Sequence, residues 1–392
     1  MITGLLSYLD INDPLVRENP YATYNRLRKE GPIFEYSPGE WLVIGFGAAR
    51  QVLLDEAFVT VRSADTRLVP ARRIGGGVLP LLAKVDHDWL RPIVSAALSR
   101  RQRTLLPFLA NLADELAEAA ALRGHFDLIR DLAVPLPHGV LSEILGVDLG
   151  DPHDLRARTA EISLLLDPGR DGEPKAPAMK AGLRLFRLAE QLVSRAQAGA
   201  RPGLIADLIS VARHEPRLTP EMIVSVILVF LFAGQETTAN LIGLGLRALL
   251  LHRDQYEVAS DAYGDSRNTV NELLRFDSPV QSTVRIANEA RSLSGRRIGR
   301  GDSLLVLIGA ANRDPQQFIA PNVLDVGRAD TTHLTFSVGS HTCLGAQLGR
   351  LEAQSAINSV CRHMPNLRIA GEISFRRHFT MRGIERLLVE SP

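Results

Sequence analysis

The sequence has 392 residues, of which 45% are hydrophobic and 23% are charged, and its formal net charge is +1. No acidic or basic tail is present, so the composition speaks against a nucleic-acid partner and against binding to an anionic membrane. Two cysteines, Cys343 and Cys361, are too few for a disulfide framework and indicate a reducing cytoplasm. The opening MITGLLSYLDINDP lacks the basic region and apolar core of a signal peptide.

Most of the first half of the chain has the apolar periodicity of helices. A strand is expected at 41–44 and a loop at 60–80, where a triple glycine is followed by no Gly-Lys-Ser/Thr and so is not a phosphate loop. A second, mobile loop is expected at 167–177, which is polar and rich in Pro and Gly. The expected helices of this half are 20–29, 46–54, 87–99, 105–122, 141–145, 155–166 and 178–198.

The longest helix is expected to begin at Thr219-Pro220, a favourable cap and first residue, and to end near Leu251. At 1.5 Å per residue its length is roughly 45–50 Å, so it must cross the middle of the molecule. The most apolar part, Met222 to Gly234, is shorter than the roughly 20 residues that span a bilayer, and polar residues follow it. We therefore interpret it as a buried core helix.

The C-terminal part predicts a helix at 268–276, short strands at 284–286, 297–298 and 303–307, and a last helix at 345–363. No repeat, linker or low-complexity tract divides the chain. We expect one domain over residues 1–392, mainly α-helical with small β-sheets.

Cys343 lies in the stretch FSVGSHTCLG, residues 336–345, directly before the last helix. A lone cysteine can be a small packed hydrophobe, which is our interpretation of Cys361. At Cys343, however, the unpaired N–H groups and the positive dipole end of the following helix favour a thiolate. The chain has no partner cysteines at the spacings of zinc or iron–sulfur cages. A single thiolate then suits an iron whose other ligands come from a macrocycle, which is haem.

At these residues the sequence resembles the cytochrome P450 superfamily of haem-thiolate monooxygenases. FSVGSHTCLG matches the family pattern Phe-x-x-Gly-x-His/Arg-x-Cys-x-Gly at every defined position, and the resemblance covers essentially the whole chain. It implies the cytochrome P450 fold, with haem b between the long central helix and the Cys343 loop and with O2 as co-substrate. Cys343 would be the iron ligand, Phe336 would pack over the thiolate, and Gly339 and Gly345 would allow a tight turn and a close approach.

Ala233-Gly-Gln-Glu-Thr-Thr238 is a polar cluster inside the apolar helix, which is costly unless it is used. It could be an ordinary buried hydrogen-bond network. By resemblance, Glu236 and Thr237 are instead the acid–alcohol pair that delivers protons to bound oxygen. Ala233 and Gly234 would leave room for O2, and Thr238 would be only a neighbour.

Two further groups of residues follow from the resemblance. Glu272 and Arg275 lie at i and i+3 of one helix, so they can pair, and Arg328 would complete a structural cluster. Leu324 stands where the family usually has an aromatic residue. Cationic donors to the haem propionates would be the following residues: His87, Arg91, Arg285 and His341. The sequence around His87, KVDHDWLR, differs from the residues that the family usually has at this place.

The implied reaction inserts one atom of O2 into a hydrophobic substrate, with a terpenoid or carboxylate-bearing secondary metabolite as our hypothesis. Arginines of the loop 59–82 could meet such a carboxylate or face solvent: Arg62, Arg67, Arg72 and Arg73. The regions 164–188 and 282–287 would also line the pocket. Without a fused flavin or iron–sulfur segment, electrons would come from a separate ferredoxin or flavodoxin with its reductase. Candidate docking contacts, or plain solvated arginines, are Arg100, Arg101, Arg103 and Arg350.

We expect a cytoplasmic monomer without a nucleic-acid or membrane partner. Two other functions remain open: a haem-thiolate isomerase or dehydratase that does not use O2, and a non-catalytic haem-binding protein. Glu236-Thr237 speaks against the first, and the lack of a signalling or DNA-binding module speaks against the second.

Overall fold

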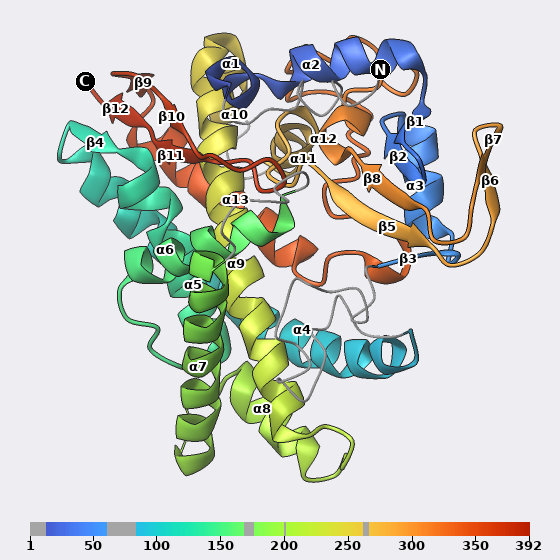
Figure 1. Cartoon of the computed structure of the whole chain (residues 1–392). Helices are drawn as coiled ribbons and strands as arrows, with labels where there is room; N and C mark the ends of the chain where they lie inside the picture. The colour runs from blue at the N-terminus through green and yellow to red at the C-terminus, as the bar shows by residue number, and fades with distance from the viewer. Residues whose placement is uncertain (1–12, 61–83, 168–175, 200, 262–265) are drawn as a thin grey trace.

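The computed structural model describes residues 13–60, 84–167, 176–199, 201–261 and 266–392. Helices make up most of this part. The largest sheet lies on one side of them, and the C-terminal strands lie on the other (Figure 1). The α-helices are α1 (Pro14–Glu18), α2 (Pro20–Leu27), α3 (Phe46–Leu54), α4 (Lys84–Ala121), α5 (Pro135–Leu145), α6 (Pro152–Ser163), α7 (Ala176–Gly199), α8 (Leu204–Ala212), α9 (Pro220–Leu251), α10 (Arg253–Asp261), α11 (Arg267–Phe276), α12 (Ile308–Ala311) and α13 (Ala346–His363).

The strands form four sheets. The largest has the order β1-β2-β8-β5-β3, in which β2 and β8 are parallel and the other pairs are antiparallel. The strands are β1 (Ile33–Ser37), β2 (Glu40–Val43), β3 (Phe58–Val59), β4 (His125–Asp127), β5 (Thr283–Ala287), β6 (Arg291–Leu293), β7 (Arg296–Ile298), β8 (Ser303–Val306), β9 (Arg368–Ile369), β10 (Ser374–Phe375), β11 (Ile384–Arg386) and β12 (Leu388–Glu390). The C-terminal strands pair as β10-β11 and as β4-β12-β9.

Helix α9 runs through the middle of the molecule, with α5, α6, α7, α11 and α13 packed along it (Figure 1). It begins as expected: Thr219 Oγ1 accepts from the Met222 amide at 3.4 Å, and Pro220 occupies the first turn. Of the described helices it alone is long and apolar enough to cross a membrane, but over half of its most apolar stretch is buried inside the protein. Burial against its neighbours therefore accounts for its composition.

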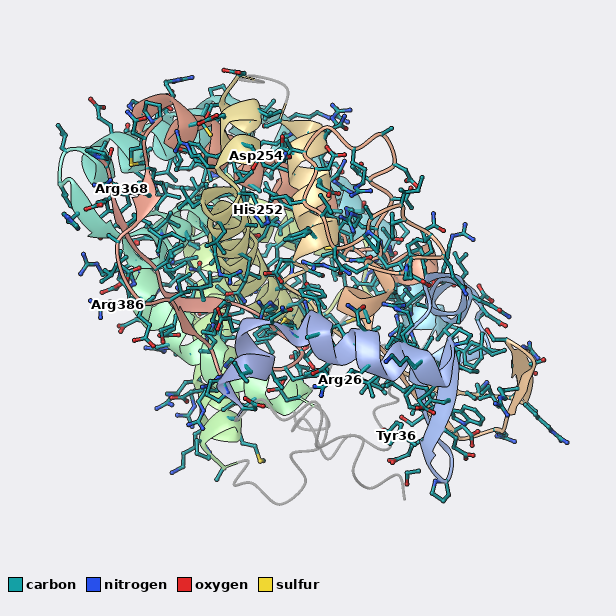
Figure 2. The ribbon with its side chains drawn as sticks, turned by 90° about the horizontal axis from the view of Figure 1, so that it is seen from above. Arg26, Tyr36, His252, Asp254, Arg368 and Arg386 are labelled. Carbon is teal, nitrogen blue, oxygen red and sulfur yellow. The ribbon has the colours of Figure 1, made fainter. Side chains whose placement is uncertain are left out.

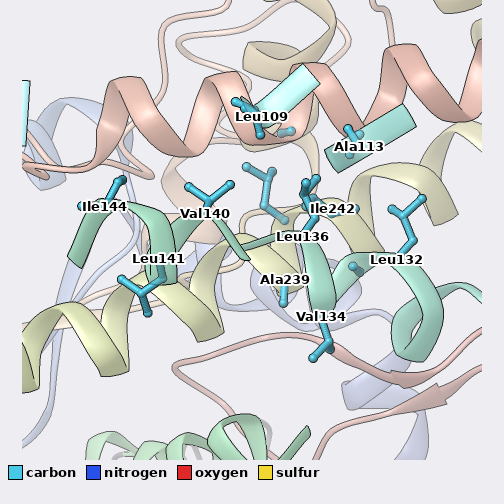
Figure 3. Close-up of a cluster of buried hydrophobic side chains, with 14 of the residues drawn as sticks. Leu109, Ala113, Leu132, Val134, Leu136, Val140, Leu141, Ile144, Ala239 and Ile242 are labelled. Carbon is cyan, nitrogen blue, oxygen red and sulfur yellow. The ribbon is translucent and has the colours of Figure 1, made fainter. Parts of the chain in front are cut away.

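The main core lies where α4, α5 and α9 meet. Leu109 from α4, Leu136 and Val140 from α5 and Ile242 from α9 point into one cluster (Figure 3). Each of these side chains is at most 1% exposed, so each contributes on the order of 2 kcal/mol through burial. Other charged side chains lie at the surface, as Arg368 and Arg386 do at the rim of Figure 2.

The structure differs from the predicted elements in places. The helices expected at 87–99 and 105–122 are one helix, α4, because Leu98 and Leu105 share a buried face across the polar run that suggested a break. The helix expected at 141–145 begins earlier, at Pro135, after a π-helix at 129–133. Helices α1, α8 and α10 and the C-terminal strands were not predicted. The expected loops lie largely outside the described residues.

A buried ionic cluster connects α11 to the segment that leads to the Cys343 loop. Arg275 donates two hydrogen bonds to Glu272, at 2.7 and 2.8 Å, and both side chains are fully buried. Arg328 Nε reaches the same carboxylate at 3.2 Å. Arg275 also donates to the carbonyl oxygens of Asn312 and Pro321, at 3.0 and 2.9 Å. The cluster thus fixes residues 312–328 against α11.

Substituting Arg275→Ala should lower the free energy of unfolding by about 3–5 kcal/mol, because the buried Glu272 carboxylate loses both of its shorter hydrogen bonds and keeps a single ion pair among the described residues, the longer one with Arg328. Urea or thermal unfolding would measure the loss. The matched control is Arg184→Ala, which breaks an exposed pair with Glu161 and should cost less than about 1 kcal/mol. Equal losses in the two variants would contradict the role assigned to the cluster.

Candidate active site

The loop before α13 holds Cys343 in a fixed turn. Its amide donates to the carbonyl oxygen of Phe336 at 2.8 Å, which closes the loop across a short 3₁₀ helix, Gly339–His341. Gly339 has φ +78°, and a Cβ there would lie 3.0 Å from the Leu53 carbonyl oxygen, so this position requires glycine. At Gly345 a Cβ would make only an ordinary contact with the sulfur, at 3.9 Å.

The Cys343 thiol is accessible, yet protein atoms surround it closely. Burial raises its pKa above the ordinary value, while a backbone hydrogen bond from Gly345 and the charges of Arg91 and Arg350 oppose the rise. The hydrogen bond from Gly345 is the contribution expected of the helix N-terminus, and burial outweighs it. A bound cation would stabilise the anion here. Phe336 lies beneath the Arg350 guanidinium, 4.5 Å from ring centre to Cζ.

Four potential cations gather beside this loop from three parts of the chain. The rings of His87 and His341 are 4.5 Å apart, and Arg91 donates to the carbonyl oxygen of Thr342. Burial, Arg285, His87 and Arg91 together lower the pKa of His341 to about 4. The resemblance named these four residues together as propionate donors, and the fold brings them into one cluster from distant parts of the chain.

Arg285 and His87 are the two buried members of this cluster. Arg285 lies on β5, is 5% exposed, and donates to Thr283 Oγ1 and to the Val284 carbonyl oxygen, both at 3.0 Å. Burial lowers its pKa to about 10, and no carboxylate among the described residues pairs with it. A buried guanidinium without a counter-charge is costly, so this position is suited to an anionic ligand group.

On α9, the two residues of the expected acid–alcohol pair have different surroundings. Thr237 Oγ1 donates to the carbonyl oxygen of Ala233 at 2.7 Å, and both residues are partly exposed on one face of the helix. A Cβ on Gly234 would approach Leu141 of α5 at 3.3 Å. Gly234 therefore serves the close packing of α5 on α9, in addition to the space we expected it to leave.

Glu236 is 1% exposed and points towards other elements. Its Oε1 accepts from Arg376 and, at 3.2 Å, from Asn240 Nδ2, while Thr159 Oγ1 lies 3.2 Å from Oε2. Within the described part of the chain, no hydrogen bond joins Glu236 to Thr237. Sequence reasoning missed Arg376 and Thr159, because no motif surrounds either residue.

Glu352 on α13 was also missed, although a carboxylate inside an otherwise apolar helical face could have signalled it. It is 3% exposed and forms a hydrogen bond with Thr238. Burial raises its pKa to about 8, and the hydrogen bond with Thr238 opposes the rise. Thr238 thus links α9 to α13, and Gln235 links α9 to the Val134 carbonyl oxygen at 3.1 Å. Part of the polar cluster on α9 is therefore structural.

Two of the four arginines considered for partner docking have partners within the chain. Arg101 forms a two-point ion pair with Asp207, at 2.9 and 2.5 Å. Arg350 donates to Asn271 Oδ1 at 2.8 Å, in addition to its contact with Phe336. Arg100 and Arg103 are exposed. The arginines considered for a substrate carboxylate, Arg62, Arg67, Arg72 and Arg73, lie outside the described residues.

Comparison with known proteins gives consistent matches over the whole chain. A sequence model described as Cytochrome P450 matches residues 266–364. The biotin biosynthesis cytochrome P450 of Bacillus subtilis is 30% identical over 95% of this chain and 96% of its own length. The cytochrome P450 monooxygenase PikC of Streptomyces venezuelae is 34% identical over 94% of this chain and 90% of its own. The chain belongs to the cytochrome P450 family.

The solved structures agree. The crystal structure of P450BioI in complex with an acyl carrier protein carrying hexadec-9Z-enoic acid superimposes with a TM-score of 0.89, at 29% identity, over 96% of this chain and all of that one. The predicted fold class is confirmed, and the protein is a cytochrome P450 monooxygenase. Enzymes of this family use O2 at a haem-thiolate centre, act on hydrophobic substrates and receive electrons from redox partners.

The residues of this site fit a haem. The accessible thiol in its fixed loop would supply the iron ligand, and the cluster of His87, Arg91, Arg285 and His341 would supply donors for two carboxylates. The buried, uncompensated charge of Arg285 is the feature that most requires such a group.

Replacing Arg285→Gln should weaken haem retention by roughly tenfold or more, because a buried charge-assisted hydrogen bond contributes about 1.5–3 kcal/mol. Haem transfer to apomyoglobin would measure the change. Arg291→Gln, on the more exposed neighbouring strand β6, is the control and should retain haem as the parent does. Equal transfer rates for all three proteins would contradict the propionate role.

Glu352 generates a prediction about pH. Its folded pKa of about 8 lies above the ordinary carboxyl value, so its contribution to stability is present below about pH 4.5 and is lost as pH rises towards 8. The neutral variant Glu352→Gln lacks this loss. Between pH 5 and pH 8 the parent should therefore lose on the order of 2–4 kcal/mol of unfolding free energy relative to the variant. Parallel pH profiles in urea unfolding would contradict the assignment.

Proposed function

We propose that the protein inserts one atom of O2 into a hydrophobic small molecule, with haem b as cofactor, Cys343 as its axial ligand and a separate ferredoxin system as electron donor. The observation that carries this proposal is the meeting of the accessible Cys343 thiol with the buried cation cluster around Arg285. The bound haem would supply reductive activation of O2, and the thiolate would favour cleavage of the O–O bond.

The chain's own residues would divide the remaining work between the two sides of this site. His87, Arg91, Arg285 and His341 would hold the propionates. On α9, Ala233 would leave space for O2. Thr237, which now donates to the carbonyl oxygen of Ala233, would hold a proton near that space. Glu236 would supply this proton after leaving its present partners, so its position controls delivery.

Contacts within the chain reduce the number of arginines that could bind the proposed redox partner. Arg101 and Arg350 are committed to contacts within the chain, which leaves Arg100 and Arg103 as the exposed members of the proposed basic face. Electrostatic attraction of an acidic ferredoxin would act through such exposed charges and would weaken with added salt.

For the substrate we propose an apolar molecule, which could be a terpenoid or a carboxylate-bearing secondary metabolite. The support for an apolar molecule is the family's hydrophobic substrates and the long acyl chain in a related complex, that of P450BioI with an acyl carrier protein carrying hexadec-9Z-enoic acid. Haem spectral shifts with matched acid and methyl-ester pairs would test the carboxylate. Equal shifts for acid and ester would exclude it as a recognition element.

The test of the function itself is the absorption spectrum of the reduced, CO-bound holoprotein. A Soret band at the red-shifted position that gives the family its name would support thiolate ligation by Cys343, and the variant Cys343→His should lose it. A band at clearly shorter wavelength in the parent protein would contradict the proposed ligand.

The variant Thr237→Ala should keep its haem and its folded stability within about 1 kcal/mol, because the side chain is only partly buried. It should divert O2 to hydrogen peroxide, since the hydroxyl that would hold the proton is gone. NADH, O2 and peroxide measured together with a surrogate ferredoxin and reductase would show this. The control Thr237→Ser keeps the hydroxyl and should release as little peroxide as the parent. If Thr237→Ala did the same, Thr237 would have no such role.

A further inference from the structure

Glu236 and Arg376 form an ion pair between distant parts of the chain. Arg376 directly follows strand β10 and lies 140 residues beyond its partner. The side chains are 1% and 4% exposed. A charge at this depth is stable only when it is paired, so Arg376 determines where the Glu236 carboxylate lies.

The C-terminal hairpin reaches α9 because one residue in it is glycine. A Cβ on Gly383 would lie 2.1 Å from Asn240 Oδ1, so no other residue allows this approach without movement. The amide of Arg376 donates to the Gly383 carbonyl oxygen at 3.0 Å, and Asn240 Nδ2 donates to Glu236 Oε1 at 3.2 Å. The contact at Gly383 therefore brings Arg376 to the turn of α9 that carries Glu236.

Charged groups from three further elements surround this pair. Burial and the charge of Arg376 lower the pKa of Arg156 on α6. The carboxylates of Glu236, Glu385 and Asp127 act in the opposite direction and only partly offset this. Arg156 donates to the Ile384 carbonyl oxygen at 2.9 Å, whereas Arg376 bonds Glu236 itself.

The pair reaches the surface through Arg376. Arg376 Nε lies 3.4 Å from Glu385 Oε2, and the Glu385 side chain is 62% exposed. The next residue, Arg386, lies at the rim of the molecule (Figure 2). Arg376 thus connects the buried Glu236 carboxylate to a solvent-exposed carboxylate, that of Glu385.

We propose that Arg376 is the positioning residue for Glu236 in proton delivery, an inference that rests on the proposed role of Glu236. In the structure Arg376 holds the carboxylate on the side of α9 that faces the hairpin. A proton taken up there from water makes Glu236 neutral and weakens the ion pair. The neutral carboxyl group can then turn, release its proton towards Thr237 and return as a carboxylate to Arg376. Arg376 keeps its own proton throughout.

The first test measures the protonation state of Glu236 in the holoenzyme while no substrate is being converted. In the holoenzyme variant Arg376→Gln the buried carboxylate loses its counter-charge, so Glu236 should take up a proton at neutral pH. The infrared difference between Arg376→Gln and the double variant Arg376→Gln/Glu236→Gln should then contain the C=O band of one protonated carboxyl group. Arg376→Lys should lack the band. Absence of the band in Arg376→Gln would overturn the proposal.

The second test is the fate of O2, which requires no knowledge of the substrate. With NADH and a surrogate ferredoxin and reductase, Arg376→Gln should raise the peroxide released per O2 consumed by several-fold, and Arg376→Lys should recover most of the loss. In the Glu236→Gln background the same substitution should have no further effect, because Arg376 acts through Glu236. Additive effects, or a parent-like ratio in Arg376→Gln, would overturn the proposal.

The control is Arg156→Gln, which removes a half-buried arginine that lies beside the pair but donates to the Ile384 carbonyl oxygen instead of to Glu236. It should keep the parent's peroxide ratio, whatever it does to thermal stability. If Arg156→Gln raised the peroxide ratio as much as Arg376→Gln does, the effect would come from a general loss of packing. The specific role of Arg376 would then be overturned. If Glu236→Gln itself left the peroxide ratio unchanged, the proposed function of Glu236 would fail instead, so the two failures are distinguishable.

Discussion

Helix α9 sets the main constraint on this protein. It is too apolar to lie at the surface, so α5, α6, α7, α11 and α13 pack around it and bury most of its length. Its polar segment, residues 235–240, must then find partners inside the protein. Gln235 donates a hydrogen bond to the carbonyl oxygen of Val134, just before α5. Glu236 accepts from Thr159 of α6 and from Arg376 of the C-terminal hairpin, and Thr238 forms a hydrogen bond with Glu352 of α13. The hydrogen bonds that these polar residues of α9 require therefore connect elements from distant parts of the chain.

The haem side of the site rests on a second constraint, the burial of positive charge. Burial lowers the pKa of Arg285, and burial together with neighbouring cations lowers the pKa of His341. The Cys343 thiol has a raised pKa for the related reason that its anion is poorly solvated. A group that brings a metal cation to the sulfur and carboxylates to the arginine relieves both costs at once. Cofactor binding and folding stability are thus expected to be coupled in this chain.

The two buried acids near α9 show how environment separates equal chemical groups. Among the described residues, Glu236 forms an ion pair with Arg376, whereas Glu352 forms a hydrogen bond with the Thr238 hydroxyl, and burial raises the pKa of Glu352. Both side chains are almost fully buried, and an arginine supplies a counter-charge to the first of them. That arginine comes from the far end of the sequence, next to the chain's C-terminal strands.

The sequence by itself determined the family, the fold class, the long central helix and the residues that carry local motifs. The stretch around Cys343, the pair Glu272–Arg275 and the segment 233–238 are read from short spacings, because each depends on one loop or one helix face. The tertiary structure decided what those residues touch. It joined the two halves of α4 across a polar run and gave Gly234 a packing neighbour in Leu141.

Only the tertiary structure placed Arg376 and Thr159 on Glu236 and Glu352 on Thr238. These contacts join residues that are far apart in the chain and carry no motif. They arise where packed elements meet, as Gly383 meets Asn240, and spacing along one element cannot predict them.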